Sequence, residues 1–228
     1  KNTSKHPLKN KLNLRFMKKK SLARLVKLFT TIFVLFYSFS PLIYIPEAFA
    51  SAPCDISLSS KEGTCFSTLK EAVDASLDGD TISLLAGTYA LSTTLTIDKA
   101  ITLQGVGDTT IIDATTTGLG WGLHINTSNV TLKNFKILAP QSSTGKGGYS
   151  IHASSSQTPM IILSNITLDG ITVENGQRTP FDFNGVNNVT VKNLTAKNST
   201  FGNGLQVSGV EDATIDNVTT SNNAWGRI

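Results

Sequence analysis

The chain has 228 residues and a formal net charge of +4, from 20 Lys and Arg against 16 Asp and Glu. The positive charge comes entirely from residues 1–50, which hold 10 basic residues and one acidic residue, so residues 51–228 hold 10 basic and 15 acidic residues and carry a net −5. This distribution argues against a nucleic-acid partner for the main part of the chain.

Residues 17–50 have the order of a secretory signal peptide. Met17 is followed by three Lys residues, by an apolar run over residues 28–45 and by the sequence "AFA" that ends at Ala50. This order predicts cleavage after Ala50 and export to the cell surface, the medium or a periplasm, with no membrane attachment after cleavage. The alternative is an uncleaved anchor, because the apolar run approaches the length of a membrane span. Residues 1–16 are interpreted as an upstream or disordered segment.

Cys54 and Cys65 are the only cysteines and follow closely after the predicted cleavage site. An exported chain meets oxidising conditions, so we expect the pair to form a disulfide. Closing so short a loop stabilises the folded state by about 3 kcal/mol in the chain-entropy model. A lipid-modified Cys54 is the alternative, but the preceding "SAP" lacks the Leu and small-residue context of a bacterial lipoprotein.

Residues 67–77 predict a short helix, followed by the strand-like segment "DTISLLAGTY". Thr68 and Glu71 match a capping box at the start of this helix. Apolar residues fall at helical spacing along one face. They are Phe66, Leu69, Ala72, Val73 and Leu77.

From residue 101 onward one short pattern recurs, as in "NVTVKNL" at 188–194. Aligning its copies places apolar residues in one column with separations of 29, 36, 23 and 24 residues. The column contains Leu103, Leu132, Leu168, Val191 and Ile215. A period in the twenties indicates stacked coils, each burying its face against the next. Apolar alternation with a phase change across Lys192 and Asn193 indicates two strands joined by a two-residue corner.

The corners of the repeat hold Asn, Asp and Gly, which tolerate a left-handed backbone. The corner after the strand holds Asn134, Gly170, Asn193 and Asn217. The corner before the strand holds Asn129, Asn165, Asn188 and Asp212. Because strands stack about 4.8 Å apart, we expect the amide side chains to hydrogen-bond along each column. Both columns are therefore interpreted as architectural.

A third strand lies upstream in each repeat, as "GLHI" at 122–125, "YSI" at 149–151, "FDF" at 181–183 and "GLQV" at 204–207. Three strands and three bends per turn describe a triangular parallel coil, and here residues 65–228 resemble the right-handed parallel β-helix proteins of the pectate-lyase-like superfamily. The predicted fold class is therefore an all-β right-handed parallel β-helix with a short N-terminal capping helix, in one domain over residues 51–228. No C-terminal cap is evident, so we expect the coil to continue beyond residue 228.

The outward positions of the third strand are the candidate site. In the alignment above they are His124, Ser150, Asp182, Gln206 and Arg227. The resemblance implies a polysaccharide bound along this strand face, with acidic residues holding Ca²⁺ and an Arg or Lys acting as the base. It makes Asp182, Arg178 and Arg227 the candidate catalytic residues. His124, Gln206 and the two tryptophans, Trp121 and Trp225, are candidate substrate-binding residues, because aromatic rings can stack on sugars.

Other interpretations of these residues stay open. Asp182 can equally be an exposed carboxylate paired with a neighbouring Arg, and His124 and His152 can be surface histidines. No metal is assigned, because two His without Met or Cys nearby make a weak copper site and no compact acidic cluster is present. We expect an exported, monomeric carbohydrate-active protein, either a lyase-like or hydrolase-like enzyme or a non-catalytic adhesion or glycan-binding module.

Overall fold

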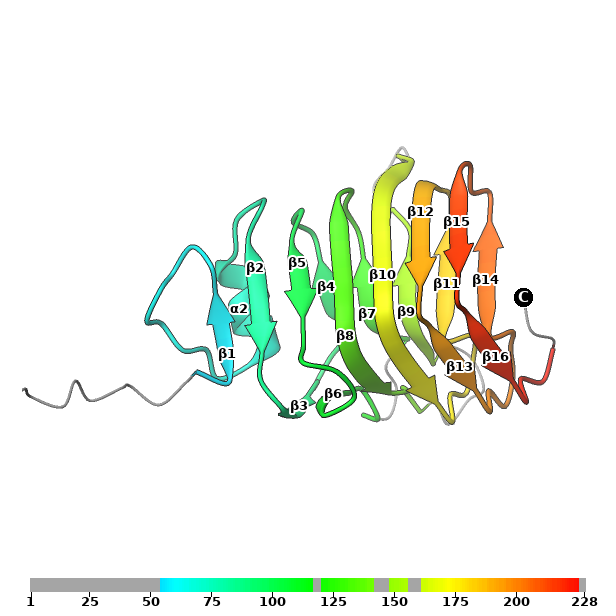
Figure 1. The fold of residues 1–228 in the computed structure, drawn as a ribbon, viewed down its shortest axis with the longest axis horizontal. Coiled ribbons are helices and arrows are strands. Elements are labelled where there is room, and N and C mark those ends of the chain that lie inside the picture. Colours follow the sequence, from blue (N-terminus) through cyan, green and yellow to red (C-terminus); the bar gives the residue numbers. More distant parts are fainter. Residues whose placement is uncertain (1–53, 117–119, 142–147, 156–160, 226–228) are drawn as a thin grey trace, which may run out of the picture. The chain divides into compact units, whose positions relative to one another are not determined.

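The computed structural model describes residues 54–116, 120–141, 148–155 and 161–225. They form a parallel β-solenoid of about five turns with one short helix at its N-terminal end (Figure 1). The predicted fold class, an all-β parallel β-helix with an N-terminal capping helix, is confirmed. The signal-peptide prediction lies outside the described residues. Within the described ranges, no helix is long and apolar enough to cross a membrane.

The strands stack on three faces. The first face contains β1 (Ile56–Leu58), β2 (Thr81–Leu84), β5 (Thr102–Gln104), β8 (Val130–Leu138), β10 (Leu163–Glu174), β12 (Val186–Lys192) and β15 (Ala213–Asp216). The second face contains β3 (Gly87–Ala90), β6 (Thr110–Asp113), the ends of β8 and β10, β13 (Thr195–Lys197) and β16 (Thr219–Ser221). The third face contains β4 (Leu95–Ile97), β7 (Trp121–Ile125), β9 (Tyr149–Ala153), β11 (Phe181–Asn184) and β14 (Leu205–Ser208).

The apolar column predicted from the repeat is confirmed by the strand register. Leu103, Leu132, Leu168, Val191 and Ile215 are consecutive Cα partners along the first face. The first four are fully buried, and Ile215 in the last described coil is 41% exposed. The interior of the coil is thus a stack of aliphatic side chains, each packed on its equivalent one turn away.

The corners have the predicted left-handed backbone. Asn129, Asn134, Asn165, Gly170, Asn188, Asn193, Asp212 and Asn217 all have φ between 49° and 65°. Their amides bond along the stack: Asn165 Nδ2 donates to Asn129 Oδ1 at 2.8 Å and Asn217 Nδ2 to Asn193 Oδ1 at 2.7 Å. A third column, Asn175, Asn198 and Asn222, was not predicted and has the same conformation.

The N-terminal helix, α2 (Leu69–Ala75), begins and ends inside the predicted range. Thr68 caps it, with Oγ1 accepting from Glu71 N at 3.2 Å, and Glu71 Oε2 accepts from Ser67 N at 3.1 Å. Leu69 and its apolar neighbours on the same face join the core. Leu77 was expected on this face and instead is exposed, because the backbone becomes extended at Ser76 and ends the helix.

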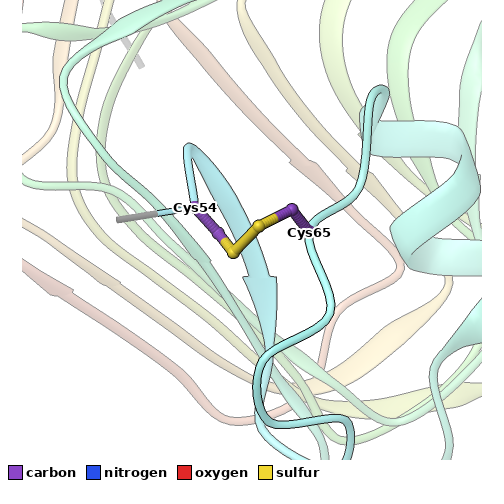
Figure 2. Close-up of a disulfide and its surroundings, with 2 residues drawn as sticks. All are labelled: Cys54 and Cys65. Atoms are coloured by element: carbon purple, nitrogen blue, oxygen red, sulfur yellow. A yellow bond between two sulfur atoms is a disulfide. The ribbon is translucent and has the colours of Figure 1, made fainter. Parts of the chain in front are cut away.

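The segment before α2 is closed by the predicted disulfide between Cys54 and Cys65, with Cα atoms 5.1 Å apart (Figure 2). It joins the residues before β1 to those before α2. β1 pairs antiparallel with β2, unlike the parallel strands that follow, and the sequence repeat did not predict this.

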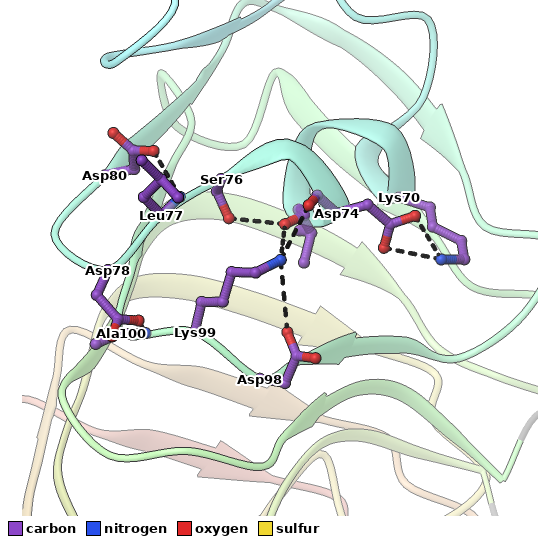
Figure 3. A network of polar contacts seen from close by, with 10 residues as sticks. Lys70, Asp74, Ser76, Leu77, Asp78, Asp80, Asp98, Lys99 and Ala100 are labelled. Carbon is purple, nitrogen blue, oxygen red and sulfur yellow. Dashed lines mark hydrogen bonds and ion pairs between the residues drawn. The ribbon is translucent and has the colours of Figure 1, made fainter.

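A polar network fastens α2 to the first coil (Figure 3). Lys99 Nζ donates to the carbonyls of Val73 and Asp74 at 2.9 and 3.0 Å, so a cation satisfies the end of the helix. The buried Asp80 accepts from Ser60 Oγ at 2.7 Å and from Leu77 N at 2.8 Å. Burial alone would raise the pKa of Asp80, but these hydrogen bonds outweigh it and lower the pKa.

Candidate functional site

The outward positions of the third face form one column across five strands. Thr96, His124, His152, Asp182 and Gln206 are consecutive Cα partners. The sequence alignment had placed Ser150 in this column. The structure instead pairs Tyr149 with Trp121, and therefore His152 with His124. Ser150 lies two residues earlier on the same face of β9 and is fully buried, so its predicted place beside His124 is wrong.

An imidazole and a carboxylate meet at the centre of the column. His152 Nδ1 lies 2.7 Å from Asp182 Oδ2, and the two side chains are only 11% and 8% exposed. A carboxylate can only accept a hydrogen bond, so the bond to Asp182 requires a proton on His152 Nδ1. The interpretation of Asp182 as an exposed carboxylate paired with an Arg is therefore wrong, because the residue is buried and its partner is a histidine.

A serine hydroxyl completes this contact on the other side of the imidazole. Ser154 Oγ lies 2.7 Å from His152 Nε2. With Nδ1 protonated, a neutral imidazole has only Nε2 free to accept, so the Ser154 hydroxyl donates to it. Ser154, His152 and Asp182 therefore form a continuous hydroxyl, imidazole and carboxylate chain. We call these three residues the Ser-His-Asp chain.

Trp121 covers the two histidines. Its ring centroid lies 4.8 Å from that of His152 with an interplanar angle of 11°, and 4.3 Å from that of His124. His124 and His152 are only 4% and 9% exposed, so their interpretation as surface histidines is wrong. Trp121 was expected to bind substrate by stacking. In this structure it stacks on the histidines and is itself half-buried.

His124 is held next to the Ser-His-Asp chain in a neutral state. Its Nε2 donates to the Ser154 carbonyl oxygen at 3.1 Å. Burial lowers the pKa of His124, the bond to Ser154 partly opposes this, and the neighbouring His152 lowers it further. The proton on Nε2 is thus committed to the carbonyl oxygen, and His124 fixes the backbone that carries the hydroxyl.

Arg178 and Trp225 lie at the margin of the site. Arg178 Nη2 donates to the Tyr149 hydroxyl at 2.8 Å, and its guanidinium lies 5.1 Å from the Tyr149 ring centroid and 5.3 Å from that of Trp225. Trp225 is 61% exposed and Gln206 follows Asp182 in the column. Tyr149 is also 5.9 Å from the His152 ring centroid, which connects the two groups.

The structure thus assembles most of the predicted residues at one place. Arg227 lies outside the described residues. Sequence reasoning gave no role here to Ser154 and Tyr149 and treated His152 as a surface residue. A signal was present in "YSIHAS", where Ser150, His152 and Ser154 alternate and so must share one face of a strand.

Three buried polar atoms of this region have no hydrogen-bond partner among the described residues. They are Ser150 Oγ, Arg178 Nε and Asp182 Oδ1. Buried polar groups in proteins are nearly always paired.

The Ca²⁺ site implied by the resemblance does not fit this region. The described residues contain no group of three His, Cys, Asp or Glu side chains placed to hold a metal ion. Asp182 is the one carboxylate in the described column, and one of its oxygens is bound to His152. Hard cations need several oxygen ligands, and the described part of this column supplies only one carboxylate.

Two hollows lie at the N-terminal end of the third face, beside α2 and β4. One cavity of about 180 Å³ is lined by Lys70, Asp74, Thr94, Thr96 and Asp98, among others. A second, of about 130 Å³, shares Lys70 and Thr94 with it. Thr96, the first residue of the outward column, lines the first of these two cavities.

Comparison with family models, curated proteins and solved structures finds no match to this chain.

Proposed function

We propose that this chain is an exported carbohydrate-active protein of the pectate-lyase-like type, which binds an extended polysaccharide along the third face and acts on it by a lyase-like or hydrolase-like reaction. The observation that carries the proposal is the buried His152–Asp182 pair at 2.7 Å in the middle of the outward column. From Thr96 to Gln206 the column spans four strand spacings, about 19 Å. A long polymer suits such a row.

The His152–Asp182 pair has the arrangement of a general base. A carboxylate that accepts from Nδ1–H fixes the ring and stabilises the imidazolium that forms when Nε2 takes a proton. Hydrolysis of a glycosidic bond ordinarily needs two carboxylates on either side of the bond. The described column supplies only Asp182, so the geometry favours base-catalysed elimination or ester hydrolysis over glycoside hydrolysis.

Two further features support export and sugar binding. The signal-peptide order of residues 17–50 and the disulfide at Cys54 are those of a chain that folds outside the cytosol. The side chains at the two ends of the column, Thr96 and Gln206, are neutral and can donate and accept hydrogen bonds. These are the properties needed to hold sugar hydroxyl groups without strong charge selection.

A non-catalytic glycan-binding or adhesion module is the second candidate. It is favoured by Trp225, which is exposed and lies beside the Arg178 guanidinium, since an exposed aromatic ring can bind a sugar face without any chemistry. On this view the His152–Asp182 pair only holds neighbouring coils together.

The test uses the secreted protein against a panel of neutral and acidic polysaccharides. Binding is measured by affinity electrophoresis, and cleavage by the release of reducing ends, unsaturated products or free acid. We expect Trp225→Ala to weaken binding, and Asp182→Asn to keep binding while lowering turnover by about 10² to 10⁴-fold. Thr190→Ala, on the first face, is the matched control.

Two outcomes would contradict the enzyme proposal. Unchanged turnover in Asp182→Asn would exclude the base and leave the binding module. Absence of binding to every glycan in the panel would exclude both versions.

A further inference from the structure

We propose that Ser154 is a nucleophile, and that the chain hydrolyses O-acyl esters carried on sugar hydroxyl groups. The proposal rests on the proposed function only for the polymer that carries the ester. The geometry that supports it is the Ser-His-Asp chain, with 2.7 Å between Ser154 Oγ and His152 Nε2 and 2.7 Å between His152 Nδ1 and Asp182 Oδ2. Catalytic serines are recognised by these two successive contacts and not by their order in the sequence.

Ser154 is more exposed than the two residues that would activate it. It is half-buried, whereas the side chains of His152 and Asp182 are only 11% and 8% exposed. A serine that merely satisfied a buried imidazole would be expected to lie inside with it. Ser154 instead keeps part of its surface open to solvent, and an ester would approach the hydroxyl from this side.

The backbone of Ser154 is fixed on both sides. Its N–H donates to the Ile125 carbonyl at 3.1 Å, and its own carbonyl accepts from His124 Nε2 at 3.1 Å. His124 Nε2 is also 3.5 Å from Ser154 Oγ, but its proton is directed to the carbonyl, so it cannot take the hydroxyl proton. His152 is therefore the base, and His124 is a positioning residue.

The reaction balances without a metal or a redox partner. Ser154 Oγ attacks the acyl carbonyl carbon and passes its proton to His152 Nε2. The ester C–O bond then breaks, and the departing sugar oxygen takes that proton and leaves as a free hydroxyl. Water, deprotonated by His152, attacks the acyl group on Ser154. The carboxylic acid leaves, and the proton returns to Ser154 Oγ.

The surroundings favour a short acyl group over a long one. The ring of Trp121 covers the histidines next to the hydroxyl, and the Tyr149 ring centroid lies 5.9 Å from that of His152. An acetyl-sized ester on a polysaccharide fits this arrangement.

The first experiment is labelling with a fluorophosphonate, which bonds to an activated serine oxygen and releases fluoride. The full secreted protein is treated, and the modified residue is located by tandem mass spectrometry. We expect the label on Ser154 and not in Ser154→Ala. His152→Gln should lower the labelling rate by at least about 10²-fold, because the hydroxyl loses its base. Ser208→Ala, at the end of β14, should label like the unmodified protein.

The second experiment is the release of acetate from an acetylated polysaccharide and of nitrophenol from p-nitrophenyl acetate. Ser154→Ala should lower both rates by about 10³-fold or more, with its urea midpoint close to that of the unmodified protein. Absence of label on Ser154 in the folded protein would overturn the nucleophile and leave glycan binding untouched. Label and nitrophenol release without any polysaccharide binding would keep the nucleophile and overturn the proposed function.

Discussion

The corner columns and the outward column of the third face are built on the same coils and differ in one respect. The corner columns repeat Asn in most coils, as in Asn129, Asn165 and Asn188, with Asp212 and Gly170 as the exceptions. The outward column changes at every coil. It contains Thr96, His124, His152, Asp182 and Gln206. A residue type that repeats from coil to coil therefore indicates side chains that stabilise the coil. A position that varies from coil to coil indicates side chains that the coil does not need for its stability.

The chemistry of the side chains explains why the two columns differ. An amide both donates and accepts, so Asn can bond to an identical Asn one coil away, and Asn217 does so with Asn193 at 2.7 Å. A carboxylate cannot donate to another carboxylate, and stacked like charges repel. Complementary neighbours such as His152 and Asp182 thus arise only where the repeat is broken.

The largest expected loss of stability comes from substitutions in the interior, which the first and third faces share. Leu168 under the first face and Phe183 under the third are both fully buried. Leu168→Ala should lower the free energy of unfolding by about 2 to 5 kcal/mol and Phe183→Ala by about 3 to 5 kcal/mol, from lost burial and the cavity left behind. Urea unfolding measures both. A much smaller loss for Phe183→Ala would mean that the third face is loosely packed, and the comparison would fail.

The next effect separates the two regions directly. Asp182→Ala leaves His152 without its partner in a buried place and should cost about 2 to 4 kcal/mol. Asp216→Ala removes the same side chain from the exposed strand β15 and should leave the urea midpoint nearly unchanged. Equal effects of the two substitutions would show that the His152–Asp182 contact is not formed in solution.

Much of the fold followed from the sequence because the repeat specifies it locally. The spacing of Leu103, Leu132 and Leu168 gave the register, and the Asn residues gave the corners. The third Asn column was missed although Asn198 stands five residues after the corner residue Asn193. The bend at Asn198 has no regular apolar alternation on one of its two sides, so the sequence shows no periodicity there.

The site was predicted less well because it depends on register between coils of different length. "GLHI" was aligned with "YSI", which set His124 against Ser150. The true register differs from that alignment by two residues, because Trp121 and not Leu123 stands opposite Tyr149. Burial of Asp182 also could not be predicted, since it depends on a histidine supplied by the preceding coil.

A smaller effect tests whether the corner Asn residues are needed for backbone, for amides or for both. Asn193 has φ 52°, and its amide bonds to Asp169 and Asn217. Asn193→Gly keeps the left-handed conformation and loses only the amide contacts, whereas Asn193→Ala loses both. We expect a loss of about 1 kcal/mol for Gly and about 2 kcal/mol for Ala by urea unfolding. Equal losses of unfolding free energy for the two variants would mean that the left-handed backbone conformation contributes nothing. That result would disagree with the natural use of Gly170 in place of Asn in one coil.

The smallest effect is a pH dependence confined to the third face. Burial lowers the pKa of His124 from its ordinary value of 6.5, so the unfolded chain binds a proton there more readily than the folded one. The stabilising contribution of the neutral imidazole is therefore complete above about pH 6.5 and decreases as the pH falls below it. The difference in unfolding free energy between the unmodified protein and His124→Gln should narrow from about pH 8 to about pH 5. For Asn193→Gly, in the corner column, the difference in unfolding free energy from the unmodified protein should be the same at each pH. A constant difference for His124→Gln as well would show that His124 titrates alike in both states and is not enclosed beneath Trp121.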